Sequence, residues 1–500
     1  MTESGSAVAA APIEAEVREG TYGSKVAAVE PGGAEFIAFS ERHGKPYQQF
    51  WTWVSPNMEF ATIFVGVIGI WFFGQSFWTA TLAIVLGTTL GSISMGALAA
   101  RGPLFGVPQM ILSRIGFGFL GNILPAGLNA VVAGIGWFAV NSVSGAFALN
   151  ALLGWNAKLC LVIIVVVELA VAFFGHNLVH AFERWAFPVL VVIFAIASVV
   201  IVSKAHLGAA ASTGFPGGFG GWLVTFGAAF GYAAGWNPYA SDYTRYLPPD
   251  TNRRATGMWA GLGVLISCVV LEIVGAAAAT ITSSSVKNPT LGFTSHLATP
   301  LADVTLLAIA LGAICANALN VYSGSMSFLA LGIKLPTSLG RAVVAIVLGV
   351  AGFFVALSGL SDFGQKYNNF LLVISYWIGP WLGVFFVDQL MRRGKRVDGF
   401  LYDRKHNPWA GFAAMAIAMA VSIYLFPNQT DYVGVVPKHN GHFGDITFEV
   451  GFVLAALLYA IFFRLQGDRS REEVLVIPDE ALAVPAADPL SPDPTDLPGR

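Results

Sequence analysis

The chain has 500 residues, of which 55% are hydrophobic and only 11% are charged, and its mean hydropathy is +0.67. Soluble domains carry about 25% charged residues, so this composition excludes an ordinary soluble protein and indicates a polytopic membrane protein. The formal net charge of −2 gives no support for nucleic-acid binding. The three cysteines, Cys160, Cys268 and Cys315, lie singly in apolar runs and predict neither a disulfide framework nor a zinc site.

The two ends of the chain differ from its middle. Residues 1–50 lack hydrophobic periodicity and residues 467–500 are acidic and rich in proline, so both predict disordered tails. Between them lie twelve apolar stretches, each close to the roughly 20 residues that cross a bilayer as a helix. The sequence therefore predicts an all-α integral membrane protein with twelve transmembrane helices. The expected centres are Val65, Ile84, Val132, Val165, Ile193, Ala229, Val269, Leu311, Leu348, Ile374, Met419 and Leu457.

The basic residues predict the orientation of these helices. If the N-terminus is cytoplasmic, 22 of the 27 Lys and Arg residues fall in inside segments and 5 in outside loops. No basic residue is then left in the middle of a span. This strong positive-inside pattern predicts a multi-pass protein of the cell membrane with both termini in the cytoplasm.

The first span, over roughly residues 60–77, contains three glycines and a polar residue. Gly66, Gly69 and Gly74, followed by Gln75, predict a broken helix whose freed backbone groups face protein, ligand or water. Glu59 lies near the cytoplasmic start of this span. An acid within a membrane is a functional-site hypothesis by default, and the alternative is a position at the membrane interface.

The third span carries an indole and an amide on one helix face. Trp137 and Asn141 are four residues apart, so their side chains lie one above the other. An indole for stacking beside an amide that both donates and accepts suits a flat heteroaromatic ligand. The alternative is an asparagine that joins two helices and a tryptophan that fills the bundle.

Several acids and histidines occur in or beside the fourth, fifth and seventh spans. Glu168 and Glu272 lie in apolar runs, where each predicts either a proton relay or a structural hydrogen bond. His176 and His180, with Glu183 following, have a spacing that can hold a metal. No second group of ligands completes such a site, and no nucleophile–base pair is visible, so the sequence predicts neither a metal centre nor an enzyme.

The stretch over residues 227–247, GAAFGYAAGWNPYASDYTRYL, begins as an apolar helix and ends as a charged, aromatic-flanked turn. Gly227, Gly231 and Gly235 recur every four residues, and Trp236 and a proline follow. A broken span with exposed backbone dipoles beside an indole is how a transporter forms a site in mid-membrane. The alternative is close helix packing through a face of small residues.

The eighth span carries two asparagines. Asn317 and Asn320 are three residues apart and share a face. Two buried amides are costly unless a polar ligand, water or each other satisfies them. If spans 1–5 and 6–10 are inverted repeats, the Gly-interrupted first and sixth spans correspond, and so do the Asn-bearing third and eighth. Matching interruptions in two halves predict a transporter with a central substrate site.

Five runs of residues resemble the nucleobase–cation symporter-1 family in its purine–cytosine permease branch. They are AGWNPYASDYTRYLP (234–248), WVSPNM (53–58), GVPQMILSRIGFG (106–118), GWFAVNSVSG (136–145) and NALNVYSG (317–324). The resemblance covers about residues 50–465. It implies a LeuT-type fold of two inverted five-helix repeats over residues 51–390, with two additional helices over 391–466. It also implies import of a nucleobase or related ring compound with H⁺ or Na⁺, and no cofactor beyond the coupling ion.

The resemblance also assigns roles by position. Trp137 and Trp236 resemble the two indoles that enclose the ring, and Gly235 lies beside the second of them. Asn141 and Asn320 resemble the amides that bind the ring, with Asn317 as a further contact. In the first span, the contact lies somewhere within residues 66–76, with Gln75 as the polar candidate.

One departure from the family bears on the coupling ion. Sodium-coupled members use hydroxyl side chains just before the eighth-span asparagines, where this chain has Ile314, Cys315 and Ala316. A hard cation needs oxygen ligands, so the departure favours proton coupling over sodium. Glu59 and Asp242 are the candidate proton carriers.

Two alternatives stay open at this point. Asp242 can instead pair with Arg245, three residues on, as a cytoplasmic gate. The cargo can be a nucleobase, such as cytosine or a purine, or another ring compound, such as allantoin, a hydantoin, uracil or a vitamin. An amino acid is a further alternative, although paired indoles argue against a carrier that aims helix N-termini at a carboxylate.

Overall fold

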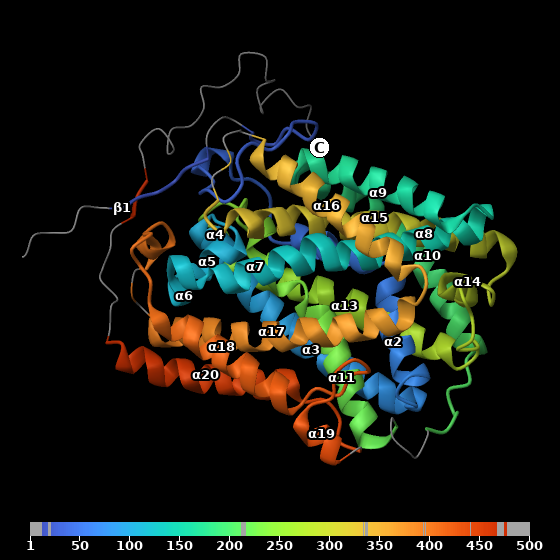
Figure 1. Cartoon of the computed structure of the whole chain (residues 1–500). Helices are drawn as coiled ribbons and strands as arrows, with labels where there is room; N and C mark the ends of the chain where they lie inside the picture. Colours follow the sequence, from blue (N-terminus) through green and yellow to red (C-terminus); the bar gives the residue numbers. More distant parts are fainter. Residues whose placement is uncertain are drawn as a thin grey trace, which may run out of the picture.

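The computed structural model describes residues 13–18, 22–211, 217–333, 335, 339–393, 395, 397–440, 442–467 and 475–477. Long helices run side by side in one bundle (Figure 1). The elements in chain order are β1 (Ile13–Glu14), η1 (Phe39–Glu41), α1 (Gln48–Val54), η2 (Ser55–Asn57), α2 (Phe60–Trp71), α3 (Phe77–Ala99), α4 (Gly102–Phe105), α5 (Gln109–Leu112), α6 (Arg114–Gly121), α7 (Ile123–Val131), η3 (Val132–Trp137), α8 (Phe138–Leu153), α9 (Ala157–Phe174), α10 (His176–Lys204), α11 (Gly218–Ala234), η4 (Asn237–Tyr239), α12 (Ala240–Thr244), α13 (Arg253–Ala279), α14 (Pro289–Thr294), α15 (Thr299–Leu329), α16 (Gly340–Gly359), α17 (Phe363–Met391), η5 (Asp398–Leu401), α18 (Trp409–Leu425), α19 (Val435–His439), α20 (Thr447–Leu465) and β2 (Leu475–Val476).

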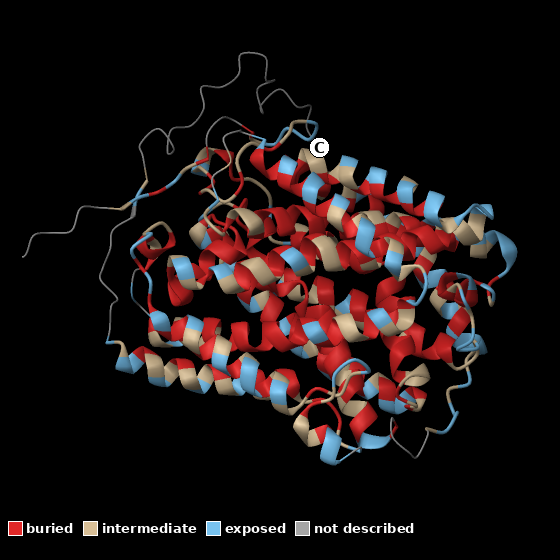
Figure 2. Cartoon of the chain, viewed as in Figure 1, coloured by how far each residue is buried: buried red, intermediate tan, exposed pale blue. Residues whose placement is uncertain are grey.

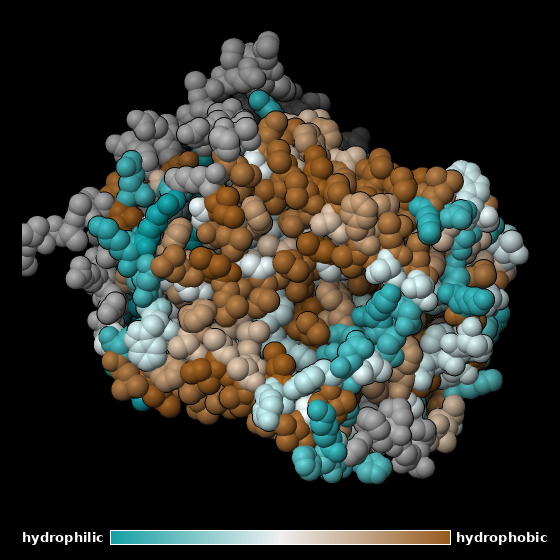
Figure 3. Space-filling model, viewed as in Figure 1, coloured by the Kyte–Doolittle hydropathy of each residue, from teal (hydrophilic) through white to brown (hydrophobic). Residues whose placement is uncertain are grey.

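The composition of the helices suits a bilayer. Within the described residues, nine helical segments are long and apolar enough to cross a membrane, and the bent pair Gln48–Asn57 and Phe60–Trp71 makes a tenth. All twelve predicted centres lie on helices. Two of these helices, α11 and α18, have 17 residues each and are slightly shorter than those nine segments. Buried residues fill the inside of the bundle (Figure 2), and apolar atoms cover most of the visible surface between its two ends (Figure 3). The outer surface is therefore matched to lipid.

The first span is broken, but not where its glycines predict. The chain bends by 59° between the segments Gln48–Asn57 and Phe60–Trp71. Pro56 lies in η2, and the Glu59 carboxylate caps α2 by accepting the Ala61 N–H at 2.7 Å. The prediction of a break at Gly66 to Gly74 is therefore wrong. Gly66 serves close packing, because a Cβ there would lie 1.7 Å from the backbone oxygen of Glu272 on α13.

The sixth span is broken where the sequence predicts. Helix α11 ends at Ala234, and Gly235, the short helix η4 and then α12 continue the chain. A proline at the start of η4 removes one backbone donor at this point. Gly231 approaches α17 so closely that a Cβ would lie 2.5 Å from the Leu371 oxygen. Gly231 thus serves close packing before the break, and Gly235 lies at the break itself. Both interpretations of the small residues in this span therefore hold.

The third span contains a turn that the sequence did not predict. Residues Val132–Trp137 form the π-helix η3 between α7 and α8. Insertion of a π-turn re-aims the side chains that follow it, and such turns are frequent at functional sites. Here the turn ends at Trp137, one residue before the helix that carries Asn141.

The N-terminal segment, defined here as residues 22–47, packs against the bundle. It lies at the end of the bundle where α4, α5 and α6 lie (Figure 1). Glu30 is fully buried in it, as are most of Glu41 and of Arg18, which precedes it. The predicted disorder is therefore wrong for the described part of residues 1–50. Contacts with distant residues hold this segment, and hydrophobic periodicity does not report such contacts.

Residues near the two ends of the chain also meet. Strand β1 pairs in parallel with β2, with Ile13 opposite Leu475. The predicted tail over residues 467–500 lies otherwise outside the described residues, apart from Gly467 and Ile477. The same holds for residues 1–12 of the predicted N-terminal tail.

Candidate functional site

Three predicted amides meet between the third and eighth spans. The Nδ2 atoms of Asn141 on α8 and Asn320 on α15 each donate to Oδ1 of Asn317, both at 3.2 Å. All three side chains are at most 2% exposed. The structure thus brings together the asparagines that the sequence predicted to share a site.

Asn317 has no hydrogen-bonding capacity left for a ligand. Its Nδ2 donates to the backbone oxygen of Phe138 at 2.9 Å and to Oγ of Ser142 at 3.0 Å, and its Oδ1 already accepts twice. In contrast, Oδ1 of Asn141 and Oδ1 of Asn320 accept no hydrogen bond from the described residues. Buried amide oxygens normally find a partner. Asn141 and Asn320 therefore offer polar groups to a ligand, and Asn317 holds them in place.

A chain of hydrogen bonds continues behind Asn317. The Ser142 hydroxyl, which accepts from Asn317, donates to the Glu168 carboxylate at 2.6 Å. Glu168 lies on α9 and is fully buried. Of the two readings of this acid, the structure places it in a structural hydrogen bond that orients the asparagines.

The two predicted indoles lie beside the two helix breaks. Trp137 is 5% exposed, and its ring contacts Tyr232, with ring centroids 5.4 Å apart. Trp236 is 7% exposed, and its Nε1 donates to Oδ1 of Asn57 in the first-span break at 2.9 Å. The break in the sixth span is therefore tied directly to the break in the first.

Gly235 provides the link between the two indoles. A Cβ at this position would lie 3.0 Å from Cζ2 and 3.1 Å from Nε1 of Trp137. The backbone just before Trp236 thus packs directly against Nε1 and Cζ2 of Trp137, and a larger residue would displace the indole.

Glu59 joins this region from the first span. Besides capping α2, its Oε2 accepts from the Ser144 hydroxyl at 3.1 Å, and Oε1 has no partner among the described residues. The side chain is fully buried, so Glu59 lies in the interior of the bundle. An acid in that position supports the functional reading of this residue.

Gln75 lies apart from the other predicted site residues. It follows the end of α2, where its amide donates to the backbone oxygens of Phe73 and Gly218, each at 3.0 Å. At the break of the sixth span, the first-span contacts come instead from Asn57 and from Trp53, whose ring lies 5.7 Å from that of Trp236. Gln75 is therefore corrected to a loop-bracing residue. The signal that identifies the true break is the Ser-Pro-Asn run just before Glu59.

Asp242 and Arg245 do not form the predicted ion pair with each other. Asp242 Oδ1 accepts from the backbone N–H of Gln109 at 2.8 Å. Arg245 donates to the backbone oxygen of Gly33 at 2.9 Å and contacts the Glu30 carboxylate at 3.2 Å. The gating candidate therefore has its partner in the N-terminal segment, which the sequence assigned to a disordered tail.

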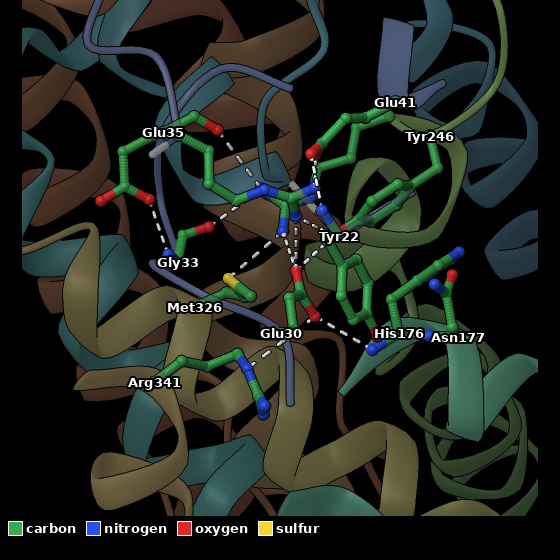
Figure 4. Close-up of polar contacts among 12 residues, drawn as sticks. Tyr22, Glu30, Gly33, Glu35, Glu41, His176, Asn177, Tyr246, Met326 and Arg341 are labelled. Carbon is green, nitrogen blue, oxygen red and sulfur yellow. Dashed lines mark hydrogen bonds and ion pairs between the residues drawn. The ribbon is translucent and has the colours of Figure 1, made fainter. Parts of the chain in front are cut away.

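Glu30 is the centre of a buried cluster of charges (Figure 4). Arg18 and Arg245 each lie 3.2 Å from its Oε1, Arg341 lies 3.8 Å from its Oε2, and the His176 backbone N–H donates to that oxygen at 3.0 Å. The hydroxyls of Tyr246 and Tyr322 also donate to Oε1. Burial alone raises the pKa of this carboxyl, but the guanidinium groups of Arg341, Arg245 and Arg18 outweigh it and hold the pKa below its usual range.

The charge cluster joins several parts of the chain. Through Glu30, the N-terminal segment is bonded to the start of α10, the chain after α12, and α16. Asn177 adds a second attachment, because its side-chain amide donates to the Gly23 oxygen at 2.9 Å. The segment therefore closes one end of the bundle.

Comparisons with known proteins agree with this arrangement. A family model described as a permease for cytosine/purines, uracil, thiamine and allantoin matches residues 37–451. The purine-cytosine permease fcyB of Emericella nidulans is 28% identical over 433 residues, covering 81% of this chain and 82% of that protein. The purine-cytosine permease FCY2 of Saccharomyces cerevisiae is 28% identical over 444 residues, covering 83% and 81%.

Solved structures show the same fold. Mhp1, a nucleobase-cation-symport-1 family transporter, in a closed conformation with bromovinylhydantoin bound, matches with a TM-score of 0.69 at 19% identity, over 87% of this chain and 95% of that chain. A Na⁺-coupled sialic acid symporter matches with a TM-score of 0.61 at 12% identity, over 87% and 92%. The predicted LeuT-type membrane fold is confirmed.

Proposed function

Because the chain belongs to the family of permeases for cytosine/purines, uracil, thiamine and allantoin, we propose that it is a secondary active symporter that imports a planar nucleobase together with a cation. Cytosine and the purines are the proposed cargo, in line with the purine-cytosine permeases to which it is similar. The observation that carries the proposal is the pair of free amide oxygens, on Asn141 and Asn320, beside two broken helices.

The site residues suggest how the ligand binds. The ring stacks between the indoles of Trp137 and Trp236, and the amides of Asn141 and Asn320 pair with its polar edge. Stacking between two indoles rejects solutes that are not planar, and the amides reject rings with the wrong donor–acceptor pattern. Rocking of the broken spans around this fixed site provides alternating access.

The cation is proposed to be a proton, and both termini are proposed to lie in the cytoplasm. The side chains just before Asn317 include no hydroxyl, so that turn offers no oxygen ligands for sodium apart from its backbone. With this orientation, the Glu30 cluster closes the cytoplasmic end of the bundle, and Arg245 acts as a gating residue through Glu30 and not through Asp242.

Uptake into proteoliposomes tests the function. Labelled cytosine and adenine are supplied with an imposed pH gradient and, separately, with a sodium gradient. Uptake driven by the pH gradient alone supports the proposal. Uptake that requires sodium would contradict proton coupling. If folded protein takes up neither base, the proposed cargo is contradicted, and other ring compounds are assayed next.

Substitution of Gly235 tests the substrate site. We expect Gly235→Ala to raise KM about tenfold, because the added methyl group displaces the Trp137 indole and overpacking costs roughly 1–3 kcal/mol. Gly227→Ala is the matched control, since its Cβ would meet no atom closer than 3.7 Å. The kinetics of uptake provide the measurement, and an unchanged KM in Gly235→Ala would contradict the assigned position of Trp137.

A further inference from the structure

One buried acid takes no part in the site described above. Glu183 on α10 is fully buried, and neither of its carboxylate oxygens has a hydrogen-bond partner among the described residues. The other fully buried glutamates of the described spans are each held: Glu59 by Ala61 and Ser144, Glu168 by Ser142, and Glu272 by Thr88. Glu183 is therefore the one acid among these four for which neither carboxylate oxygen is held by a hydrogen bond of normal geometry from the described residues, although the Ser55 hydroxyl and the Cys315 thiol lie beside it.

Glu183 lies where α10 meets the break of the first span. The hydroxyl of Ser55, in η2, donates to the backbone oxygen of Glu183 at 2.9 Å. Besides that hydroxyl, the Cys315 thiol on α15 neighbours the carboxyl. Cys315 precedes Asn317 by two residues, so this position adjoins the layer of asparagines.

No charge in the surroundings balances an ionised Glu183. The titratable groups that face it from other elements are Cys315 and Tyr243, both of which are neutral side chains in their ordinary state. On α10 itself, His180 is engaged with the Thr52 hydroxyl at 3.1 Å. None of the ion pairs between described residues includes Glu183. An unpaired buried carboxylate is very costly, so this packing requires the neutral acid.

We propose that Glu183, in place of the sequence candidates Glu59 and Asp242, is the residue that carries the coupling proton, an inference that rests on the proposed symport of a nucleobase with a proton. Hydrogen bonds from Ala61 and Ser144 hold Glu59, and one from the Gln109 N–H holds Asp242. The carboxylate takes one proton from water when the outer side is open, and the closed packing of η2 against α10 and α15 then holds the neutral acid. When the cytoplasmic side opens, water reaches the carboxyl and the same proton leaves to it. One proton is thus moved in each cycle.

The first-span break couples this proton to the substrate. Asn57 in η2 holds the indole of Trp236, and Ser55 in the same turn holds α10 at Glu183. A bound ring on Trp236 and a proton on Glu183 therefore favour the same position of η2. Two ligands that bias one element in this way bind cooperatively.

The test is Glu183→Gln in proteoliposomes, which keeps the shape of the side chain but removes the acid. We expect accumulation driven by a pH gradient to fall about tenfold or more, within the 5- to 150-fold range of coupling between two sites. Counterflow, in which unlabelled cytosine or adenine inside exchanges for labelled base outside, needs no net proton movement and is expected to stay near the wild-type rate. Glu183→Asp retains an acid and is expected to restore part of the gradient-driven accumulation.

Glu272→Gln is the matched control, because it makes the same change in a fully buried glutamate that can still accept from Thr88. It is expected to keep gradient-driven accumulation. Full accumulation in Glu183→Gln would overturn the assignment, and so would loss of counterflow in that variant, which would indicate a structural role. Wild-type accumulation driven only by sodium would also overturn it, whereas absence of wild-type counterflow would contradict the nucleobase function itself.

Discussion

Replacement of Asn320 by alanine is expected to reduce nucleobase uptake by roughly 10²-fold or more. Its Oδ1 accepts no hydrogen bond from the described residues, and its Nδ2 is aligned by Asn317. A site built to bond a polar edge discriminates strongly once that bond cannot form, because the groups on the other side are left unpaired in a buried place. The loss is expected in transport and in binding, with little change in the amount of protein in the membrane.

Asn129→Ala is the control for this prediction. Asn129 is also a fully buried asparagine of the third span, and its amide bonds to the hydroxyl of Ser327 on α15 at 2.7 Å. Each variant removes a buried amide that makes one side-chain hydrogen bond and whose oxygen has no partner among the described residues. The bond of Asn320 stays within α15, to Asn317, whereas that of Asn129 joins the third and eighth spans. Binding of labelled cytosine to purified protein and uptake into cells are the measurements. Equal losses of binding and uptake in both variants would indicate that Asn320 acts only in helix packing.

Glu30→Gln is expected to lower both the thermal stability and the transport rate strongly. The change leaves Arg18, Arg245 and Arg341 without the carboxylate that all three approach. Loss of one partner of a buried ion pair typically costs about 3–5 kcal/mol. Because Glu30 holds the N-terminal segment on α10 and α16, we expect this end of the bundle to close less firmly and accumulation to fall about tenfold or more, since 1.4 kcal/mol already shifts an equilibrium tenfold.

Glu35→Gln provides the control within the same segment. The Glu35 carboxylate is only partly buried and accepts the Gly33 N–H at 2.6 Å, which a glutamine can also do. The melting temperature in detergent and the initial rate of uptake are compared for both variants. A Glu30→Gln protein as stable and active as Glu35→Gln would show that the cluster does not hold the closed end.

The charge cluster also predicts a dependence on pH. The pKa of Glu30 is held below its usual range in the folded protein by the arginines, against the opposing effect of burial. Its contribution to stability is therefore complete above the ordinary carboxyl pKa and is lost as the pH falls through the lowered value. Thermal stability of the wild type is expected to decline in that acid range, and this part of the decline is expected to be absent from Glu30→Gln.

The amino-acid sequence by itself determined the class of protein, the positions of the helices and most of the residues from which the proposed substrate site is built. Apolar runs of bilayer length predict spans because no water is available in a membrane to satisfy a backbone that is not helical. Gly235, Trp236 and a proline place the sixth-span break, since these residues act locally on the chain that contains them. Spacings of three and four residues placed each asparagine on a face of its own helix.

Only the tertiary structure decided which of these residues act together. A glycine in a span can indicate either a broken helix or close packing between helices. Only the position of α13, directly against Gly66, shows that this glycine allows close packing. Likewise, Asn317 has no free capacity only because Phe138 and Ser142 reach it from another span. The assignment of Glu30 to a disordered tail failed for the same reason. Its three arginines come from positions 18, 245 and 341, and pairings at such separations leave no periodic trace in the sequence around any one of them.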